Sequence, residues 1–373
     1  MNAFLYTNRQ GRPITIHSHS AGNEFKTCRR KYALKRIHGW KEKKKNASRE
    51  FGNCIESAIK FYHDSGKRTG VAAIEFARQW RFFEKDETLT YTDRDGSWAD
   101  LLQTGIELME LYELVEPTLP LGKQPRFQLN YRKELFAGTE LAGVEYTAYV
   151  DVTTEEPRIV DIKTAANPLP DILGIATLDP QLREYAWISG IQNVAWLWLV
   201  KAKASAFQKG DNATVLRIEN SQADHSWEGK IGVVLFADEE FVYIAEPAVY
   251  EQYSQEVKGV KGKALDAKKA AWAEREDVRG FSPNLLTKQR IQFVTGRIPD
   301  EDLTEIGNEI ARVVSEIVRA NEESSWPKIP GVRFPSNHCL ICPFLGNCTE
   351  NKELRDTLVE RTDEDWLDKL EDE

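Results

Sequence analysis

The chain has 373 residues and 41% apolar content, which is enough for the core of one large or two ordinary domains. It contains no run of eighteen apolar residues, and its first residues lack the apolar stretch of a signal peptide, so we expect neither a membrane-spanning helix nor secretion. Five cysteines, an odd number, argue against a disulfide framework, and we therefore expect a cytoplasmic protein.

The formal net charge of −9 combines two oppositely charged segments. Residues 26–49 contain eleven Lys or Arg residues and one acid, whereas residues 350–373 contain eleven acids and four bases. The basic segment has the composition of a phosphate-binding surface, although a merely solvated run of charge would look the same. The acidic tail could dock a protein partner.

Two helices are predicted near the N-terminus. Ser18 or Ser20 can cap the first helix. The first helix carries these residues: Phe25, Cys28, Tyr32 and Leu34. The second helix begins near Ser48 and places Gly52 one turn before Glu56, where a glycine leaves room for an ion or a backbone to approach. Glu56 is therefore either a metal ligand or an exposed helical acid paired with Lys60.

Acidic residues then recur at the ends of two predicted strands. Two scaffold helices, residues 70–85 and 98–114, precede strands at 127–136 and 141–152. The second strand ends at Asp151, and the next strand brings Asp161 and Lys163 onto one face. Two converging carboxylates bind a hard divalent cation, and a lysine beside them can orient a water or balance the charge of a phosphate. The pattern indicates metal-assisted phosphodiester hydrolysis, and a surface hairpin with exposed charges is the alternative.

A helix and a buried strand follow this hairpin. Asp179 can cap the helix and Pro180 can open it, which places Gln181 and Tyr185 on one face. The apolar run at residues 194–200 predicts a strand that is buried on both faces of a central sheet. The remaining predictions are a loop or hairpin extension at 204–229, strands at 231–236 and 240–245, and an amphipathic helix at 302–322. No Gly-x4-Gly-Lys-Ser/Thr motif is present, which excludes a helicase motor within this sequence.

Four of the five cysteines form a one-plus-three pattern. Cys339-x2-Cys342-x5-Cys348 lies near the C-terminus, and Cys28 lies near the other end of the sequence. Four thiolates suit either a tetrahedral zinc ion or an iron–sulfur cluster, but zinc modules usually use two close pairs of ligands. Cys54 is predicted to be a buried apolar residue on the Glu56 helix.

These sequence features and their order along the chain resemble those of the PD-(D/E)XK nuclease superfamily, in its RecB-like iron–sulfur branch. That branch includes the AddB-type nuclease domain and the nucleases of CRISPR adaptation. The resemblance is carried by Phe25-Lys-Thr-Cys28-Arg-Arg-Lys-Tyr32, Gly52-x3-Glu56, Asp151-x9-Asp161-Ile-Lys163, Gln181-x3-Tyr185 and the terminal cysteines. Glu56 stands where the family more often has histidine.

The resemblance implies an α/β fold with a restriction-endonuclease-like core, in which a mixed central sheet is flanked by helices. It also implies an iron–sulfur domain built from both chain ends. Three regions follow: residues 1–47 with the N-terminal helix, the basic arm and one cluster cysteine; residues 48–255 with the nuclease core; and residues 256–373 with a helical C-terminal region, the other cluster cysteines and the acidic tail.

The resemblance further implies a role for each candidate residue. Mg²⁺ or Mn²⁺ would be held by Glu56, Asp151, Asp161 and the main-chain carbonyl of Ile162, and Lys163 would join the three acids as a catalytic residue. A [4Fe–4S] cluster would be held by Cys28, Cys339, Cys342 and Cys348, with zinc as the alternative. DNA would be contacted by Gln181, Tyr185, Arg29, Arg30 and Lys31.

The implied activity is metal-dependent DNA exonuclease action, on single-stranded ends, in recombination, repair or phage DNA processing. The implied setting is the cytoplasm of a bacterium or of a phage-infected host cell. The alternative is a non-catalytic, cluster-stabilised DNA-binding or scaffold subunit of a nuclease complex, and the complete set of three acids and a lysine argues against it. A zinc-dependent hydrolase would need a His-Glu-x-x-His or comparable site, whereas the six histidines here are scattered.

Overall fold

A computed structural model of the chain describes residues 18–360, except 137–138, 140, 143, 171, 203–205, 219–223, 239, 261, 273–274 and 334–336, together with residues 6–7 and 13–14. The greater part of the predicted acidic tail, residues 361–373, lies outside the described residues. Across the described ranges, no helix is both long enough and apolar enough to cross a membrane.

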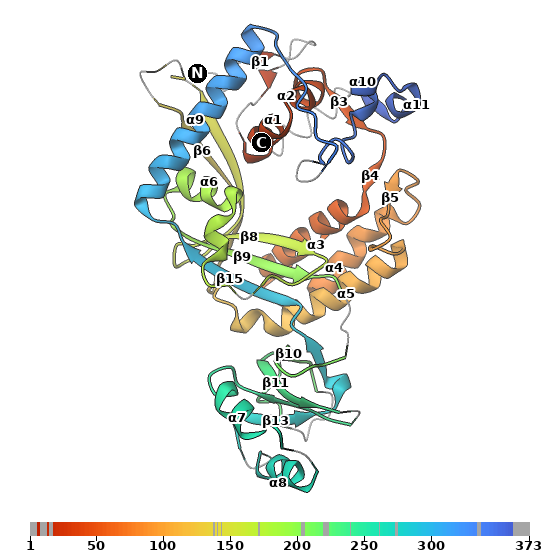
Figure 1. Cartoon of the computed structure of the whole chain (residues 1–373), viewed down its shortest axis with the longest axis vertical. Helices are drawn as coiled ribbons and strands as arrows, with labels where there is room; N and C mark the ends of the chain where they lie inside the picture. The colour runs from red at the N-terminus through yellow and green to blue at the C-terminus, as the bar shows by residue number, and fades with distance from the viewer. Residues whose placement is uncertain are drawn as a thin grey trace.

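A five-stranded mixed sheet lies at the centre of the protein (Figure 1). Its order is β15-β9-β8-β7-β6, in which β8 and β9 run parallel and the other neighbours are antiparallel. The strands are β6 (Arg126–Glu134), β7 (Glu145–Thr153), β8 (Ile159–Ala165), β9 (Asn193–Val200) and β15 (Ile291–Arg297). The apolar run predicted as a buried strand is β9, which pairs with β8 on one side and β15 on the other.

Helices cover both faces of the central sheet. On one face lie α3 (Ala47–Asp64), α4 (Val71–Trp80) and α5 (Trp98–Val115), and on the other lie α6 (Pro180–Ser189) and α9 (Asp300–Glu322). Because side chains alternate along a strand, β8 contributes Val160 and Ile162 to the first core and Ile159 to the second. The predicted mixed sheet flanked by helices is confirmed.

A second sheet is inserted between β9 and β15. It is antiparallel throughout, in the order β13-β12-β11-β10-β14, and it stands apart at the bottom of Figure 1. Its elements are β10 (Asn212–Val215), β11 (Ile231–Ala237), β12 (Val242–Ala245), α7 (Tyr250–Glu256), α8 (Lys263–Trp272), β13 (Val278–Phe281) and β14 (Leu286–Lys288). The expected boundary at residue 255 falls inside this insertion, because β12 pairs with β13 across it. The described part of the region expected to be helical also contains four strands.

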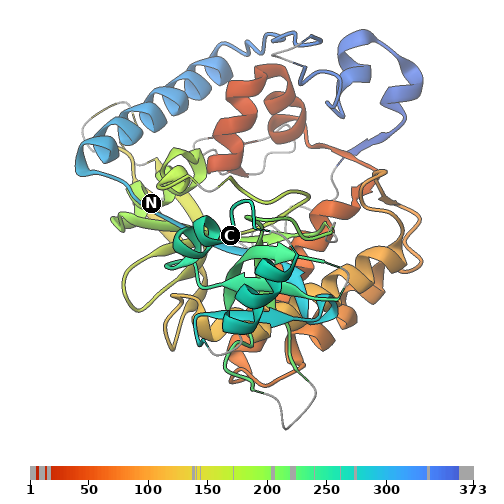
Figure 2. The same cartoon turned by 60° about the horizontal axis from the view of Figure 1, so that its bottom comes forward.

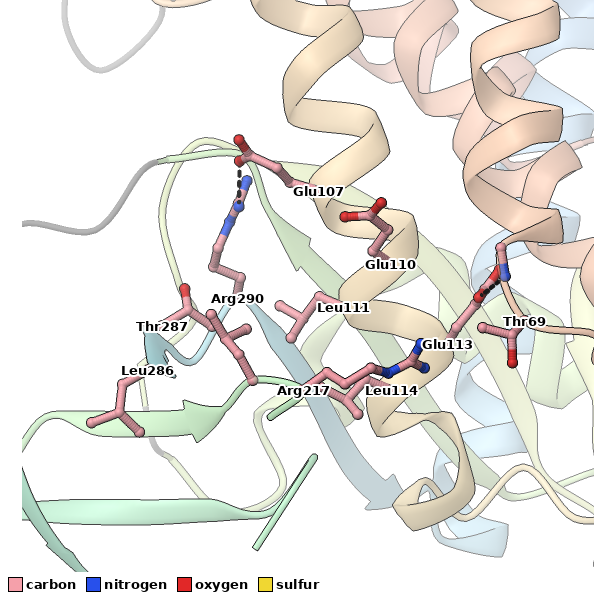
Figure 3. Close-up of a pocket in the computed structure, with 12 residues that line it drawn as sticks. Thr69, Glu107, Glu110, Leu111, Glu113, Leu114, Arg217, Leu286, Thr287 and Arg290 are labelled. Atoms are coloured by element: carbon pink, nitrogen blue, oxygen red, sulfur yellow. Dashed lines mark hydrogen bonds and ion pairs between the residues drawn. The ribbon is translucent and has the colours of Figure 1, made fainter. Parts of the chain in front are cut away.

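One arginine connects both ends of the insertion to each other and to helix α5. Arg290, just before β15, donates hydrogen bonds to the carbonyls of Val200 and Lys201 at 3.0 and 3.2 Å and pairs with Glu107 of α5 at 3.2 Å. Arg290 and Glu107 border a cavity of about 560 Å³ between α5 and the second sheet (Figure 3). None of the candidate site residues named above lines that cavity.

The two ends of the chain pack against each other. Near the N-terminus are α1 (His19–Thr27), α2 (Arg29–Tyr32) and β3 (Trp40–Glu42), and near the C-terminus are α10 (Leu345–Thr349), α11 (Lys352–Arg355) and β16 (Leu358–Glu360). β16 pairs antiparallel with β3, and Phe25 and Tyr32 share a core with Val313 and Ile317 of α9. Figure 2 shows the N-terminal helices beside α9.

A buried histidine in the α3–α5 interface gives the fold a pH-dependent element. His63 Nε2 lies 2.7 Å from the Tyr112 hydroxyl, with Glu116 at 4.0 Å. Burial, assisted by Lys67 and opposed by Asp64, lowers the pKa of His63 from 6.5 to about 4. The folded protein therefore resists a proton that the unfolded chain accepts. Stability from the neutral imidazole is fully present above pH 6.5 and falls as the pH drops towards about 4.

We expect His63→Gln to flatten this acid-dependent loss of stability by roughly 2–3 kcal/mol, since glutamine does not titrate. Urea unfolding of both proteins at pH 7 and pH 4.5 measures the difference. The same pH dependence in both proteins would show that the imidazole is not held neutral in the fold.

Candidate active site

The candidate site opens where β7 and β8 separate. These strands pair at Val152 with Val160 and at Thr153 with Ile159. Further along, the N–H of Ile162 donates to Asp151 Oδ2 at 2.8 Å. The Asp151 carboxylate thus accepts a backbone hydrogen bond where β7 and β8 no longer pair with each other. This contact holds Asp151 next to Ile162.

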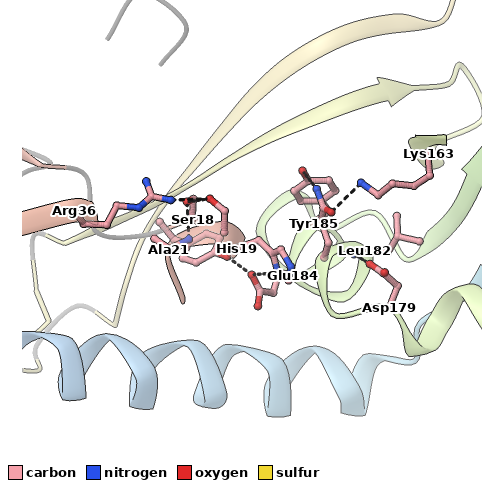
Figure 4. A network of polar contacts seen from close by, with 12 residues as sticks. Ser18, His19, Ala21, Arg36, Lys163, Asp179, Leu182, Glu184 and Tyr185 are labelled. Carbon is pink, nitrogen blue, oxygen red and sulfur yellow. Dashed lines mark hydrogen bonds and ion pairs between the residues drawn. The ribbon is translucent and has the colours of Figure 1, made fainter. Parts of the chain in front are cut away.

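Lys163 lies between a buried carboxylate and an amide. Its Nζ donates to Asp161 Oδ1 at 2.9 Å and to Gln181 Oε1 at 3.1 Å. Asp161 is fully buried, whereas the Lys163 side chain is 36% exposed. Figure 4 shows the lysine directed towards Tyr185 of α6. The predicted grouping of Asp161 and Lys163 on one face of β8 is therefore formed in the structure.

Helix α3 brings Glu56 to the same place from the other side of β8. Gly52 lies one turn earlier, where a Cβ atom would sit 3.3 Å from Thr164 Oγ1, so the glycine permits the close approach of helix and strand. The charge of Glu56 is coupled to those of Lys163 and Asp161. Lys60, the partner considered for Glu56 in a purely structural role, instead pairs with Asp64 at 3.0 Å.

Burial makes the carboxylates of this site hard to ionise together. Burial is the largest cause that raises the pKa of Glu56 to about 7; the charge of Lys163 opposes the shift and the charge of Asp161 adds to it. Burial likewise raises the pKa of Asp151, with Glu56 adding to the effect, and the pKa of Asp161, where Lys163 opposes it. Burial lowers the pKa of Lys163, but the charge of Asp161 outweighs this and the net shift is upward, so the ammonium stays charged.

The chemistry of these donors fits a divalent cation. Asp161 Oδ2 is buried and accepts no hydrogen bond from a described residue, although it lies 2.9 Å from Lys163 Nζ. Fully ionised, three carboxylates and one ammonium carry a charge of −2, which one divalent ion would neutralise. As they stand, the described residues contain no group of three or more His, Cys, Asp or Glu side chains arranged to hold a metal ion. The assignment of metal ligands therefore stays a prediction.

The sequence match agrees with this geometry. A family model described as the PD-(D/E)XK nuclease superfamily matches residues 17–349. The chain belongs to this superfamily. No curated protein sequence matches it. A solved structure described as "Crystal structure of SSO0001" is similar over 43% of this chain and 63% of that one, less than two thirds of its length, at 12% identity and a TM-score of 0.18. A likeness at that score supports no conclusion about the fold.

The four predicted cluster cysteines of this nuclease act on one another electrostatically: Cys28 and Cys348 act on Cys342, and Cys28 and Cys339 act on Cys348. The described residues contain no group of three or more cysteines arranged to hold a metal ion. Cys28 forms the break between α1 and α2, with an extended backbone (φ −163°), so the single helix expected there is interrupted at the cysteine. Burial raises the pKa of Cys342 and of Cys348, and ionisation of Cys28 would raise both further. The backbone N–H of Gly331 donates to Cys339 Sγ at 3.2 Å. Neither the cluster nor the RecB-like iron–sulfur branch is shown by these contacts, and both stay predictions.

Cys54 stands apart from that group. It is buried on α3 within the first core, and burial, followed by the charges of Glu50 and Glu75, raises its pKa to about 12. The interpretation of Cys54 as a buried apolar residue agrees with this environment.

The basic residues next to Cys28 have different surroundings. Arg29 pairs with Glu316 of α9 at 2.6 Å, and its guanidinium lies 5.0 Å from the centre of the Phe25 ring. Lys31 and Arg30 act electrostatically on Cys342 and Cys348, respectively. Arg29 therefore ties α2 to α9, and the DNA contacts predicted for the three residues stay untested.

A buried ion pair beside the site was not predicted from the sequence. Lys201, directly after β9, donates to Asp95 Oδ1 at 2.8 Å and to Ser48 Oγ at 2.7 Å, and the Asp95 side chain is only 1% exposed. Ser48 lies in the first turn of α3, so the contacts fix the start of the Glu56 helix to the central sheet. A lysine immediately after the apolar run at 194–200 is the only sequence signal for it.

Proposed function

We propose that this nuclease is a Mg²⁺- or Mn²⁺-dependent deoxyribonuclease that hydrolyses phosphodiester bonds at single-stranded DNA ends, in recombination, repair or phage DNA processing. The observation that supports the chemistry is the convergence of Glu56, Asp151, Asp161 and Lys163 at the point where β7 and β8 separate. The family supports nuclease activity as such.

The residues of the site have different proposed roles in hydrolysis. Glu56, Asp151, Asp161 and the carbonyl of Ile162 would hold the divalent ion, which supplies Lewis-acid stabilisation of the charge on the phosphate. Lys163 has three N–H donors, of which the described residues take two, through Asp161 and Gln181. The third can donate to a phosphate oxygen or hold the attacking water. Hydrolysis forms a bond between the water oxygen and phosphorus, breaks the bond between phosphorus and one sugar oxygen, and transfers a proton from the water to that sugar oxygen.

The basic segment and the four cysteines have proposed roles in DNA binding and in cluster binding, respectively. The basic segment at residues 26–49, including Arg30 and Lys31, is proposed to attract the DNA backbone through its positive charge. The four cysteines are proposed to bind a [4Fe–4S] cluster, supported by the electrostatic coupling of Cys28 to Cys342 and Cys348.

One assay tests the function. Purified protein is incubated with Mg²⁺ or Mn²⁺ and with end-labelled single-stranded DNA, double-stranded DNA, and circular single-stranded DNA. We expect metal-dependent release of short products from the linear single strand and little cutting of the circle. Equal cutting of circle and linear strand would contradict exonuclease action, and no cutting of any DNA with either metal would contradict the proposed function.

Glu56→Gln should change the response of the protein to metal. In EDTA we expect a melting temperature a few degrees above that of the wild type, because one of three buried carboxyl groups that repel one another when they ionise is replaced by a neutral amide. Added Mn²⁺ should stabilise the variant less, and cleavage should need more Mn²⁺, because one oxygen ligand has lost its charge. Thermal melting across a Mn²⁺ titration measures both effects. Glu110→Gln, at an exposed acid of α5, is the control, and identical metal responses in both variants would remove Glu56 from the site.

A further inference from the structure

The Gln181–Tyr185 pair is placed to act on Lys163. Tyr185 is buried, with 6% of its surface exposed, so its ring is covered by the protein. Its hydroxyl accepts a hydrogen bond from Gln181 Nε2 at 2.6 Å, and Gln181 Oε1 in turn accepts one from Lys163 Nζ at 3.1 Å. A buried ring is poorly suited to stack on a base or to bind a strand directly.

The hydrogen-bond chain has only one workable direction. Lysine is a donor only, so the amide must turn its oxygen towards the ammonium and its nitrogen towards the tyrosine. Burial raises the pKa of Tyr185, and the nearby charges of Asp151 and Asp161 raise it further, so the hydroxyl stays protonated. The amide is thus held at both ends, and it offers Lys163 an acceptor without adding a fourth negative charge to the site.

Helix α6 fixes the position of this acceptor. Asp179 caps the helix through the N–H of Leu182 at 2.8 Å, and Pro180 occupies the first turn, so Gln181 stands on a well-defined helix start. Three residues after Gln181, Glu184 lies 3.1 Å from His19 Nδ1 of α1 and accepts a hydrogen bond from the Tyr146 hydroxyl (Figure 4). Three contacts therefore hold the helix that carries Gln181: the Asp179 cap at its start, and the contacts of Glu184 with β7 and with α1.

We propose that Gln181 is a positioning residue for Lys163, with Tyr185 as the anchor of its amide, and that neither side chain is a primary DNA contact. A flexible lysine has many rotamers, and two acceptors, Asp161 and Gln181, hold its ammonium at one place on β8. This inference rests on the proposed nuclease function for its catalytic consequence, but the restraint on Lys163 can be measured without activity.

The test compares Gln181→Met with Gln192→Met. Gln192 also makes two side-chain hydrogen bonds, to Asp300 and Arg297, but it lies outside the site. Single-turnover cleavage of a single-stranded oligonucleotide at saturating protein should slow about 10–100-fold in Gln181→Met and stay unchanged in Gln192→Met. The Kd for the oligonucleotide, measured with Ca²⁺ in place of Mg²⁺, should stay within about twofold for both. Tyr185→Phe should slow cleavage about 2–10-fold, because the amide loses one of its two partners.

Two further measurements separate positioning from a general structural role. Gln181→Glu keeps the acceptor oxygen but adds a fourth negative charge, so it should recover part, and not all, of the rate that Gln181→Met loses. Labelling of Lys163 by an amine-reactive ester, followed peptide by peptide by mass spectrometry, should accelerate in Gln181→Met and not in Gln192→Met. This labelling reports on the restraint even if the wild-type protein cleaves no DNA, an outcome that would overturn the proposed function alone.

Two results would overturn the positioning role. A Kd raised tenfold or more in Gln181→Met, with an unchanged rate at saturation, would make Gln181 a DNA contact. Unchanged labelling of Lys163 in Gln181→Met would show that the amide does not restrain the ammonium.

Discussion

Replacing Lys163 with alanine, or Asp161 with asparagine, should lower the rate of DNA cleavage by a factor on the order of 10²–10³ or more, while the protein stays folded and binds DNA. Among the described residues, Lys163 supplies the one ammonium that pairs directly with Asp161, and its third N–H is available to donate to the phosphate or the water. Asp161→Asn keeps the shape of the side chain but removes the charge that pairs with Lys163 and that, in the proposed function, would hold a divalent ion.

The decisive measurement is the cleavage rate at saturating DNA, together with the Kd and the melting temperature of each variant. Lys60→Ala is a matched control, because Lys60 has a similar exposure (38% against 36%) and an ion pair to Asp64, but it lies in the last two turns of α3. Wild-type cleavage in Lys163→Ala would mean that the assigned site is wrong. A low melting temperature in that variant would instead mean that its loss of activity reflects the fold.

The hairpin, the Glu56 helix and the Gln181 helix could be predicted because each carries a local signal. Period-two alternation placed Asp161 and Lys163 on one face of β8, and an Asp-Pro pair marked the start of α6. The glycine one turn before Glu56 indicated a close approach, and the structure shows that the approaching group is Thr164 of β8.

Other features depend on partners that are distant in sequence. β10 and β14 have four and three residues and become strands only by pairing with each other and with β11, so the insertion could not be recognised from its own periodicity. The hydrogen bond from Lys163 to Gln181 depends on the crossing of β8 and α6. The break at Cys28 depends on contacts near both chain ends, where the helical pattern of α1 and α2 continues in the sequence but not in the backbone.

The cysteine group provides the second large expected effect. Protein purified without oxygen should be brown and contain about four iron and four sulfide per chain, as expected for a [4Fe–4S] cluster. Cys28→Ser should remove the colour, because Cys28 would be the ligand that belongs to the N-terminal half of the assembly. Cys54→Ser is the matched control, since Cys54 is also buried and N-terminal but lies within the core of α3, and its variant should keep the colour.

Loss of the bound cluster in Cys28→Ser should lower the melting temperature by roughly 5–10 °C without unfolding the chain ends. The pairing of β3 with β16 and the packing of Phe25 and Tyr32 on α9 do not involve a cysteine, so they should hold the ends together. The candidate active-site residues are also separate from the cysteines, but helix α1 links the two regions. Its first residue, His19, contacts Glu184 of α6, and Cys28 directly follows its last residue. Cys28→Ser should therefore reduce cleavage through α6 and DNA binding, and less than Lys163→Ala does.

Metal analysis by mass spectrometry decides between the alternatives. Stoichiometric zinc without iron, in protein kept free of oxygen throughout, would overturn the cluster while leaving the nuclease site untouched. The two sites can be separated in this way because the site at β8 offers buried oxygen donors suited to a hard cation, whereas the chain ends offer sulfur donors suited to iron or zinc. If Cys28→Ser protein kept its colour, Cys28 would not be a ligand of the metal centre. There would then be no reason to expect the metal centre to connect the two ends of the chain.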